Sequence, residues 1–175
     1  MTVIAARPRP LAGGGMPRRM LLLTALLCAL LVAGFLWWRS DPRVTPPVPD
    51  ARGAAVCRAL DRALPQSLQG TARRDPQPAS PFTAAWASAP RTVLSCGGPV
   101  PEALEHPDAS QQGGTVNGVD WLTESLGDGG YRFTTIERRA TVQVTVPAGA
   151  YPHASDVLPG ISDAVARTDP SRFTQ

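Results

Sequence analysis

Residues 20–38 form an apolar run, MLLLTALLCALLVAGFLWW, that contains no charged residue. A helix of this length, at about 1.5 Å per residue, spans close to the ~30 Å hydrocarbon core of a bilayer. Four arginines precede the run: Arg7, Arg9, Arg18 and Arg19. Trp37 and Trp38 close it. A basic flank and an aromatic end are typical of a membrane-spanning helix whose N-terminus is cytoplasmic. We therefore expect a single-pass protein of the plasma membrane that contacts the lipid bilayer through residues 20–38.

Two other interpretations of this run remain open. A cleaved secretory signal has a shorter apolar stretch, about 7–15 residues, and ends in a small-x-small site. Here Ala33-Gly34 is the only small pair near the end of the run. A lipoprotein would carry its lipid on Cys28, but Leu26 and Leu27 precede that cysteine where a small residue is needed. We favour the uncleaved anchor, in which Cys28 is an ordinary apolar residue of the helix.

Composition divides the rest of the chain into three parts. Residues 1–19 are rich in Arg, Pro and Gly and are expected to form a disordered, basic cytoplasmic tail. Residues 39–50 (RSDPRVTPPVPD) form a Pro-rich linker, which should be extended and stiff. Residues 51–175 are long enough for one extracytoplasmic domain with a modest core.

The basic residues are concentrated before the apolar run. The chain has 17 basic residues, all of them Arg, and 14 acidic residues. From Arg39 onward the count is 13 Arg against 14 Asp and Glu, a net charge of −1. The positive charge therefore belongs to the membrane topology, and we expect no nucleic-acid partner.

Cys57 and Cys96 are the only cysteines of the predicted extracytoplasmic domain, where disulfides persist. A bridge that closes a loop of roughly 40 residues would stabilise the domain by about 3–4 kcal/mol. We predict this disulfide over a free reactive thiol or a metal site. The spacing of the cysteines with His106 and His153 does not match a zinc site, so no metal ligand and no cofactor is predicted.

Local patterns predict an α+β domain in which two helices flank an antiparallel sheet. Asp50 should cap a helix that ends at Leu64, before Pro65. A second helix should span residues 156–167, with Ser155 as its cap. Strands are expected at residues 84–87, 92–96, 131–138 and 141–146, and residues 66–81 should be irregular.

Asn117-Gly118 between β-forming residues predicts a type I′ hairpin. Its second arm carries Trp121, and the alternation of a strand places that ring in the core with the valines of residues 141–146. The opposite face, which carries Gln143, Thr145 and Arg132, is expected to be open to partners. In the alternative, Trp86 and Trp121 lie exposed together as a sugar-binding platform.

The sequence contains no nucleophile elbow, phosphate-binding loop, dinucleotide fingerprint or zinc-protease motif, and no catalytic residue is predicted. The only acidic group that resembles an acid–base site is Glu102, Glu105 and Asp108 with His106. Its position on a Pro-bounded segment favours a solvated loop.

Three segments carry a resemblance to a known family: AAWASAPRTVLSCGGP (84–99), VNGVDWL (116–122) and YRFTTIERRATVQVTVP (131–147). Together with the helix that contains Cys57, they resemble the actinobacterial single-pass membrane proteins called domain of unknown function 3515. The resemblance implies a cell-envelope location and a paired cysteine, but no activity.

Two functional hypotheses follow. The leading one is a non-enzymatic, membrane-anchored binding or scaffold module with an envelope-protein or cell-wall partner. The alternative is an envelope enzyme that acts on cell-wall polymer through the acids of residues 102–108.

Overall fold

The computed structural model describes residues 18–38, 44–106 and 112–171. It contains two compact units, Met1–Ser40 and Asp41–Gln175. Residues 1–17 of the predicted tail (1–19) and residues 39–43 of the predicted linker lie outside the described residues, and Arg18 and Arg19 belong to α1 instead of the tail. In the first unit, α1 spans Arg18–Trp38, and its side chains at 19–34 are all exposed. Within the described residues, the structure contains no helix with the length and apolarity needed to cross a membrane.

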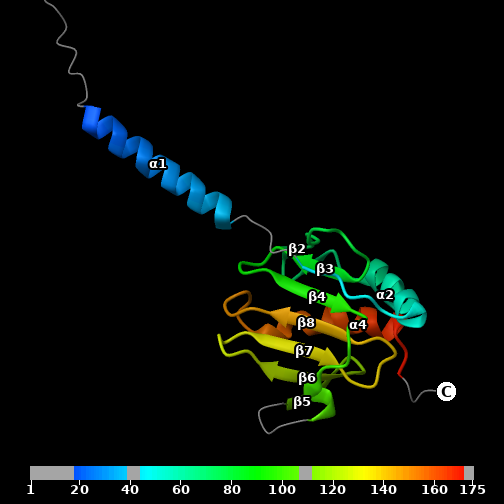
Figure 1. Ribbon diagram of the computed structural model, residues 1–175. Coiled ribbons are helices and arrows are strands. Elements are labelled where there is room, and N and C mark those ends of the chain that lie inside the picture. The colour runs from blue at the N-terminus through cyan, green and yellow to red at the C-terminus, as the bar shows by residue number, and fades with distance from the viewer. Residues whose placement is uncertain (1–17, 39–43, 107–111, 172–175) are drawn as a thin grey trace, which may run out of the picture. The chain divides into compact units, whose positions relative to one another are not determined.

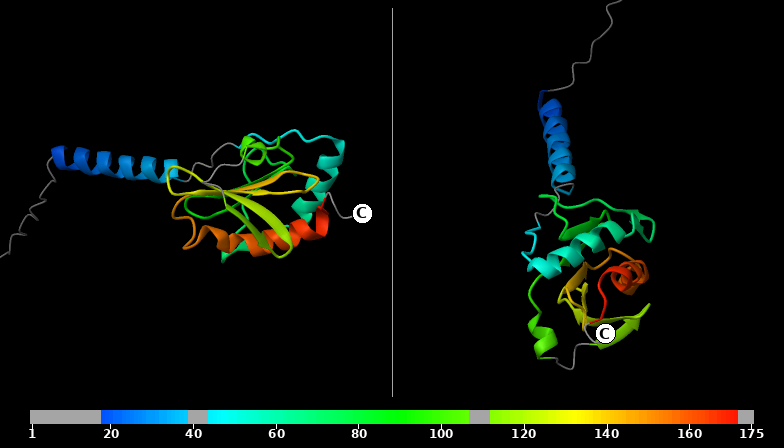
Figure 2. Two further views of the ribbon diagram at one scale, coloured as in Figure 1. Left: turned by 90° about the horizontal axis from the view of Figure 1, so that it is seen from below. Right: turned by 90° about the vertical axis from the view of Figure 1, so that its right-hand side faces the viewer.

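The second unit is an α+β domain built on a six-stranded antiparallel sheet of order β3-β4-β8-β7-β6-β5 (Figure 1). The strands are β3 Thr83–Trp86, β4 Thr92–Cys96, β5 Gln112–Val116, β6 Val119–Ser125, β7 Tyr131–Thr135 and β8 Val142–Val146. The helices are α2 Ala51–Ala63, α3 Glu102–Glu105, the 3-10 turn Ala154–Val157 and α4 Leu158–Thr168. α4 lies beneath one face of the sheet and packs against α2 (Figure 2).

The local signals for α2 are confirmed. The Asp50 carboxylate accepts a hydrogen bond from the Gly53 N–H at 2.7 Å, as expected of an N-cap. The helix ends where the Leu64 N–H donates to the Leu60 carbonyl at 2.9 Å. Its buried side includes Cys57 and Leu60, so the helix carries the cysteine into the core.

The predicted hairpin is also confirmed. Asn117 and Gly118 have φ values of 49° and 75°, which is the left-handed conformation that both central residues of a type I′ turn require. Val116 and Val119 are paired directly across the turn. The Asn117 side-chain amide donates to the Asp163 carboxylate of α4 at 2.8 Å, so the turn is tied to the helix below the sheet.

Trp121 occupies the predicted core position. Trp121 is 1% exposed, and it belongs to the same buried cluster as Val142, Val144 and Val146. The indole N–H donates to the Ser162 hydroxyl of α4 at 2.9 Å. A buried ring with its polar atom satisfied joins the sheet to the helix layer.

The opposite face of the sheet is less open than predicted. The three residues predicted to be open, Arg132, Gln143 and Thr145, are half-buried. Leu122 and Thr134, which are paired on the same face, are buried. Near the end of β7, Leu104 of the α3 segment and side chains of the β7–β8 turn line a common cavity.

Four local predictions need correction. The interval 66–81 contains a short hairpin, β1 Ser67–Leu68 and β2 Thr71–Ala72, closed by Gln69-Gly70 at positive φ. Ser155 does not cap α4, because it lies inside the 3-10 turn and accepts the Leu158 N–H with its carbonyl. Residues 102–105 form α3 instead of a loop. β7 ends at Thr135, three residues before the predicted end.

Candidate functional site

The two edges of the sheet differ in how their backbone groups are used. Beyond β3, residues 72–74 run alongside the strand. The Arg74 N–H donates to the Ala85 carbonyl at 2.7 Å, and the Ala87 N–H donates to the Ala72 carbonyl at 3.0 Å. These bonds use groups that an edge strand would otherwise present to another chain. The β3 edge is therefore closed.

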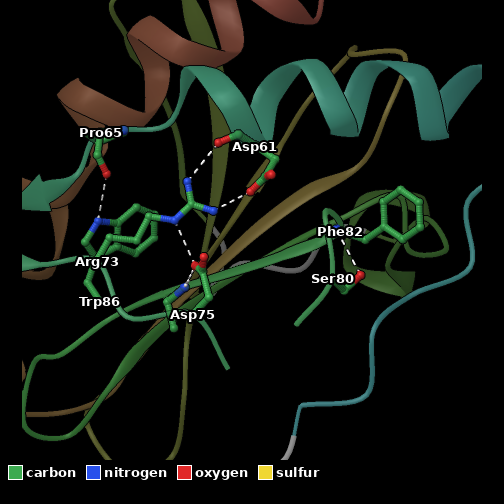
Figure 3. Close-up of polar contacts among 8 residues, drawn as sticks. Asp61, Pro65, Arg73, Asp75, Ser80, Phe82 and Trp86 are labelled. Atoms are coloured by element: carbon green, nitrogen blue, oxygen red, sulfur yellow. Dashed lines mark hydrogen bonds and ion pairs between the residues drawn. The ribbon is translucent and has the colours of Figure 1, made fainter. Parts of the chain in front are cut away.

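An arginine holds the covering segment in place (Figure 3). The Arg73 guanidinium donates to the Asp61 carbonyl and to the Asp75 carboxylate, each at 2.8 Å, and forms an ion pair with the Asp61 carboxylate. Burial lowers the Arg73 pKa, but the hydrogen bonds to Asp75 and Asp61 outweigh it and raise the pKa above its usual value. Beside this cluster, the Trp86 indole N–H donates to the Pro65 carbonyl at 3.2 Å. The arginine thus fastens the covering segment to α2.

β5 forms the other edge and pairs, among the described strands, only with β6. Its sequence, QGGTV, contains no charged residue and no Pro. Gln112, Gly113, Gly114 and Thr115 are exposed, and Val116 is half-buried. Charged residues, Pro and bulges are the usual protection of an open edge against pairing with another strand. β5 contains neither charged residues nor Pro.

The register shows which backbone groups face outward from β5. Thr115 is paired with Asp120, and the Asp120 carbonyl accepts the Ile136 N–H at 2.8 Å on the far side of β6. Because the N–H and C=O of a strand residue point to the same side, Thr115 and Asp120 form a non-hydrogen-bonded pair. The N–H and C=O of Thr115, and by alternation those of Gly113, therefore point to the open edge.

The two glycines of β5 are not required by the packing of the domain. A Cβ added at Gly113 or Gly114 would meet no atom within 4 Å, and neither residue has a positive φ. In contrast, Gly97 has a φ of +87°, and a Cβ there would lie 2.4 Å from Pro49. Glycine within a strand permits close approach of another backbone. The β5 glycines are suited to such an approach.

A second candidate is a cavity of about 200 Å³ between the α3 segment and the β7–β8 turn. Its lining consists of Val100, Leu104, Thr135, Ile136, Glu137, Arg138 and Thr141. This volume is below the ~300–1,000 Å³ of typical small-molecule sites. The Arg138 guanidinium donates to the Asp169 carbonyl at 2.9 Å, so part of its donor capacity is used within the fold. The cavity is a weaker candidate than the open edge.

Of the acids singled out in the sequence, the two that the structure describes do not line this cavity. Glu102 and Glu105 are exposed on α3, and neither lines the cavity. His106 is also exposed, and Asp108 lies outside the described residues. Within the described parts of the chain, no group of three or more His, Cys, Asp or Glu side chains could hold a metal ion.

The two tryptophans considered for sugar binding are both in the core. Trp86 is 0% exposed and Trp121 is 1% exposed. Their indole nitrogens donate to Pro65 and Ser162, as described above. Buried rings cannot stack on a sugar, so the sugar-platform hypothesis is wrong.

Cys57 and Cys96 form the predicted disulfide. The S–S distance is 2.02 Å and the Cα atoms are 5.6 Å apart. Both residues are buried, so the bridge is a structural link between α2 and β4. Cys28 is free and exposed on α1.

Asp169 is a buried carboxylate that the sequence analysis missed. It accepts the Arg139 N–H at 3.0 Å and the Ala140 N–H at 3.2 Å, and it is 0% exposed. Burial raises the Asp169 pKa, and the two backbone bonds and the neighbouring Arg138 oppose this in part. The residue joins the end of α4 to the β7–β8 connection, which is a structural role.

Comparison with known proteins identifies one family. A family model described as "Protein of unknown function (DUF3515)" matches residues 20–173. No curated protein and no solved structure matches the chain.

Proposed function

This chain belongs to DUF3515, a family of proteins of unknown function, and we propose that it is a membrane-anchored binding module of the cell envelope. The proposal has three parts: an anchor at residues 20–38, a domain outside the cytoplasm, and a binding surface at the edge of its sheet. The observation that carries the binding role is the open, uncharged β5 edge in a sheet whose other edge is closed.

The anchor is supported by the sequence of the whole run 20–38. It has no charge, and its basic flank lies on the N-terminal side. The leucines between residues 21 and 31 of α1 are exposed, as expected of a helix that is apolar on all sides and surrounded by lipid tails. This orientation places the C-terminal domain outside the cytoplasm, where the Cys57–Cys96 disulfide is stable.

The binding surface is supported by the outward backbone groups of β5. An extended strand added to a sheet edge gains main-chain hydrogen bonds, with little dependence on side chains. Gly113 and Thr115 supply these groups, and Gly114 between them leaves room for close approach. The expected partner therefore presents an extended segment of backbone.

The enzyme hypothesis finds no comparable support. It requires Glu102 and Glu105 to meet at a cavity, and both lie outside the lining of the 200 Å³ cavity next to α3. Binding at the β5 edge needs no catalytic group.

Site-specific photocrosslinking in native envelope membranes tests the proposed function. A photoreactive amino acid at Gly113 should give adducts with one or a few specific proteins, because this residue lies on the open edge. The matched control is the same amino acid at Gly127, where an added Cβ also meets no atom within 4 Å. Equal adduct patterns from Gly113 and Gly127, or no adduct from Gly113, would contradict binding at this edge.

A further inference from the structure

We propose that the strand received by β5 is the β5 strand of a second copy of this chain. This inference rests on the proposed function and names its partner. The two strands would run antiparallel about a two-fold axis at Gly114, and the two six-stranded sheets would become one continuous sheet.

The outward groups of β5 are arranged symmetrically about Gly114. Gly113 and Thr115 lie one residue to either side of it, and both direct their N–H and C=O to the open edge. In an antiparallel pairing centred on Gly114, Gly113 of each copy lies opposite Thr115 of the other. Each such pair can exchange both backbone hydrogen bonds, so every outward group of Gly113 and Thr115 is satisfied. An interface in which the same patch serves both copies is the usual form of a two-fold dimer.

The side chains are compatible with this pairing. Gly114 meets Gly114 on the axis, where opposed side chains would approach most closely. Thr115 meets a glycine on one face, and Val116 meets Gln112 on the other. Because QGGTV carries no charge, no like charges are brought together across the new strand pair. The Thr115 hydroxyl is already hydrogen-bonded to the Asp120 carboxylate of its own chain, so it needs no partner from the second copy.

The composition of β5 favours a second copy of this chain over a partner that is recognised through its side chains. A β5 edge with exposed Gly113 and Gly114 offers few side chains for the recognition of a particular peptide sequence. It offers a symmetric set of backbone groups, which an identical strand can match. The anchor proposed above would raise the local concentration of copies within one membrane, which favours their association.

Cysteine crosslinking of the full-length chain in membranes tests this register. The background variant is Cys28→Ser, since Cys28 is the free thiol and the other two cysteines are bridged. In the proposed dimer the two Gly114 Cα atoms, as a non-hydrogen-bonded pair, lie about 4.5 Å apart, within the range of a disulfide. The two Gly113 Cα atoms lie roughly 8 Å apart, beyond that range.

Gly114→Cys should therefore form a disulfide-linked dimer on mild oxidation. The yield of this dimer from Gly113→Cys should be at least about tenfold lower. The two variants are matched, because both are glycines of β5 without a neighbour for an added Cβ. A native fold is verified in each by circular dichroism and by a cooperative thermal melt that matches the Cys28→Ser background. A companion variant, Gly114→Lys, places two positive charges on the axis and should convert the full-length dimer to monomer in lipid nanodiscs.

The outcomes separate this inference from the proposed function. No dimer from folded Gly114→Cys, or equal dimer from both cysteine variants, overturns the pairing of two β5 strands. If Gly113 then crosslinks to a different protein, the binding edge stands and only the identity of its partner is wrong. If Gly113 gives no adduct of any kind, both proposals fail.

Discussion

Replacement of Trp121 by Ala tests whether this ring joins the sheet to the α4 layer. Trp121 is 1% exposed and is among the largest fully buried side chains of the domain. Truncation of a buried Trp to Ala costs about 3–5 kcal/mol. It also removes the donor to Ser162, which is itself 0% exposed, and this adds about 1 kcal/mol. The expected loss in free energy of unfolding is therefore about 4–6 kcal/mol, a large share of the ~5–15 kcal/mol of a typical domain.

The measurement is urea unfolding of the detergent-solubilised full-length chain, followed by circular dichroism. Tyr131→Ala is the matched control, because it removes an aromatic ring from the same face of the neighbouring strand β7. Tyr131 is 40% exposed, so its truncation should cost only about 1 kcal/mol. Ser162→Ala should also cost about 1 kcal/mol and isolates the hydrogen bond. A Trp121→Ala variant no less stable than Tyr131→Ala would refute the assignment of this ring to the core.

Three further predictions concern the links that hold the domain together. Reduction of the Cys57–Cys96 bridge, which has a sequence separation of 39, should lower the free energy of unfolding by about 4 kcal/mol; identical melting of oxidised and reduced protein would contradict this. Gly97→Ala should lower the free energy of unfolding by about 1–3 kcal/mol more than Gly70→Ala, as measured in thermal melts. Both glycines have positive φ, but only at Gly97 would an added Cβ come within 2.4 Å of Pro49 in the linker. Because burial raises the pKa of Asp169 in the folded state, the folded state binds this proton more tightly than the unfolded state. The contribution of Asp169 to stability should then fall as pH rises from its ordinary pKa of about 3.9 through the raised value. The stability difference between wild type and Asp169→Asn, measured at a series of acidic pH values, should show this slope, and a difference independent of pH would be evidence against it.

Elements with a local cause could be predicted from the sequence. Asp50 caps α2 through its own side chain, and Asn117-Gly118 forms its turn because both residues adopt positive φ readily. The position of Trp121 in the core follows from strand alternation relative to that turn. The disulfide could be predicted because the domain has only two cysteines.

Features that depend on the order of strands could not be predicted. β8 lies between β4 and β7, and nothing local in either strand specifies that β4 pairs with β8. The difference between the closed β3 edge and the open β5 edge follows from this order and from Arg73, whose partner Asp61 lies in a separate element. Asp169 was missed because an acidic residue after a helix is usually solvated, and its burial becomes visible only with the β7–β8 connection in place.

The strand order also has a consequence for how the domain assembles. Strands β5, β6, β7 and β8 follow one another both in the chain and in the sheet, so each of their pairings closes only a short loop. The β3–β4 pairing is equally local. Among the named strands that the structure describes, the pairing that joins distant parts of the chain is that of β4 with β8, where Cys96 lies opposite Val142. Because distant contacts carry the larger loop-closure cost, the two local parts can form early and their junction should form late. Cys96 lies on that junction, so oxidation with Cys57 would fasten the domain at the contact that forms last.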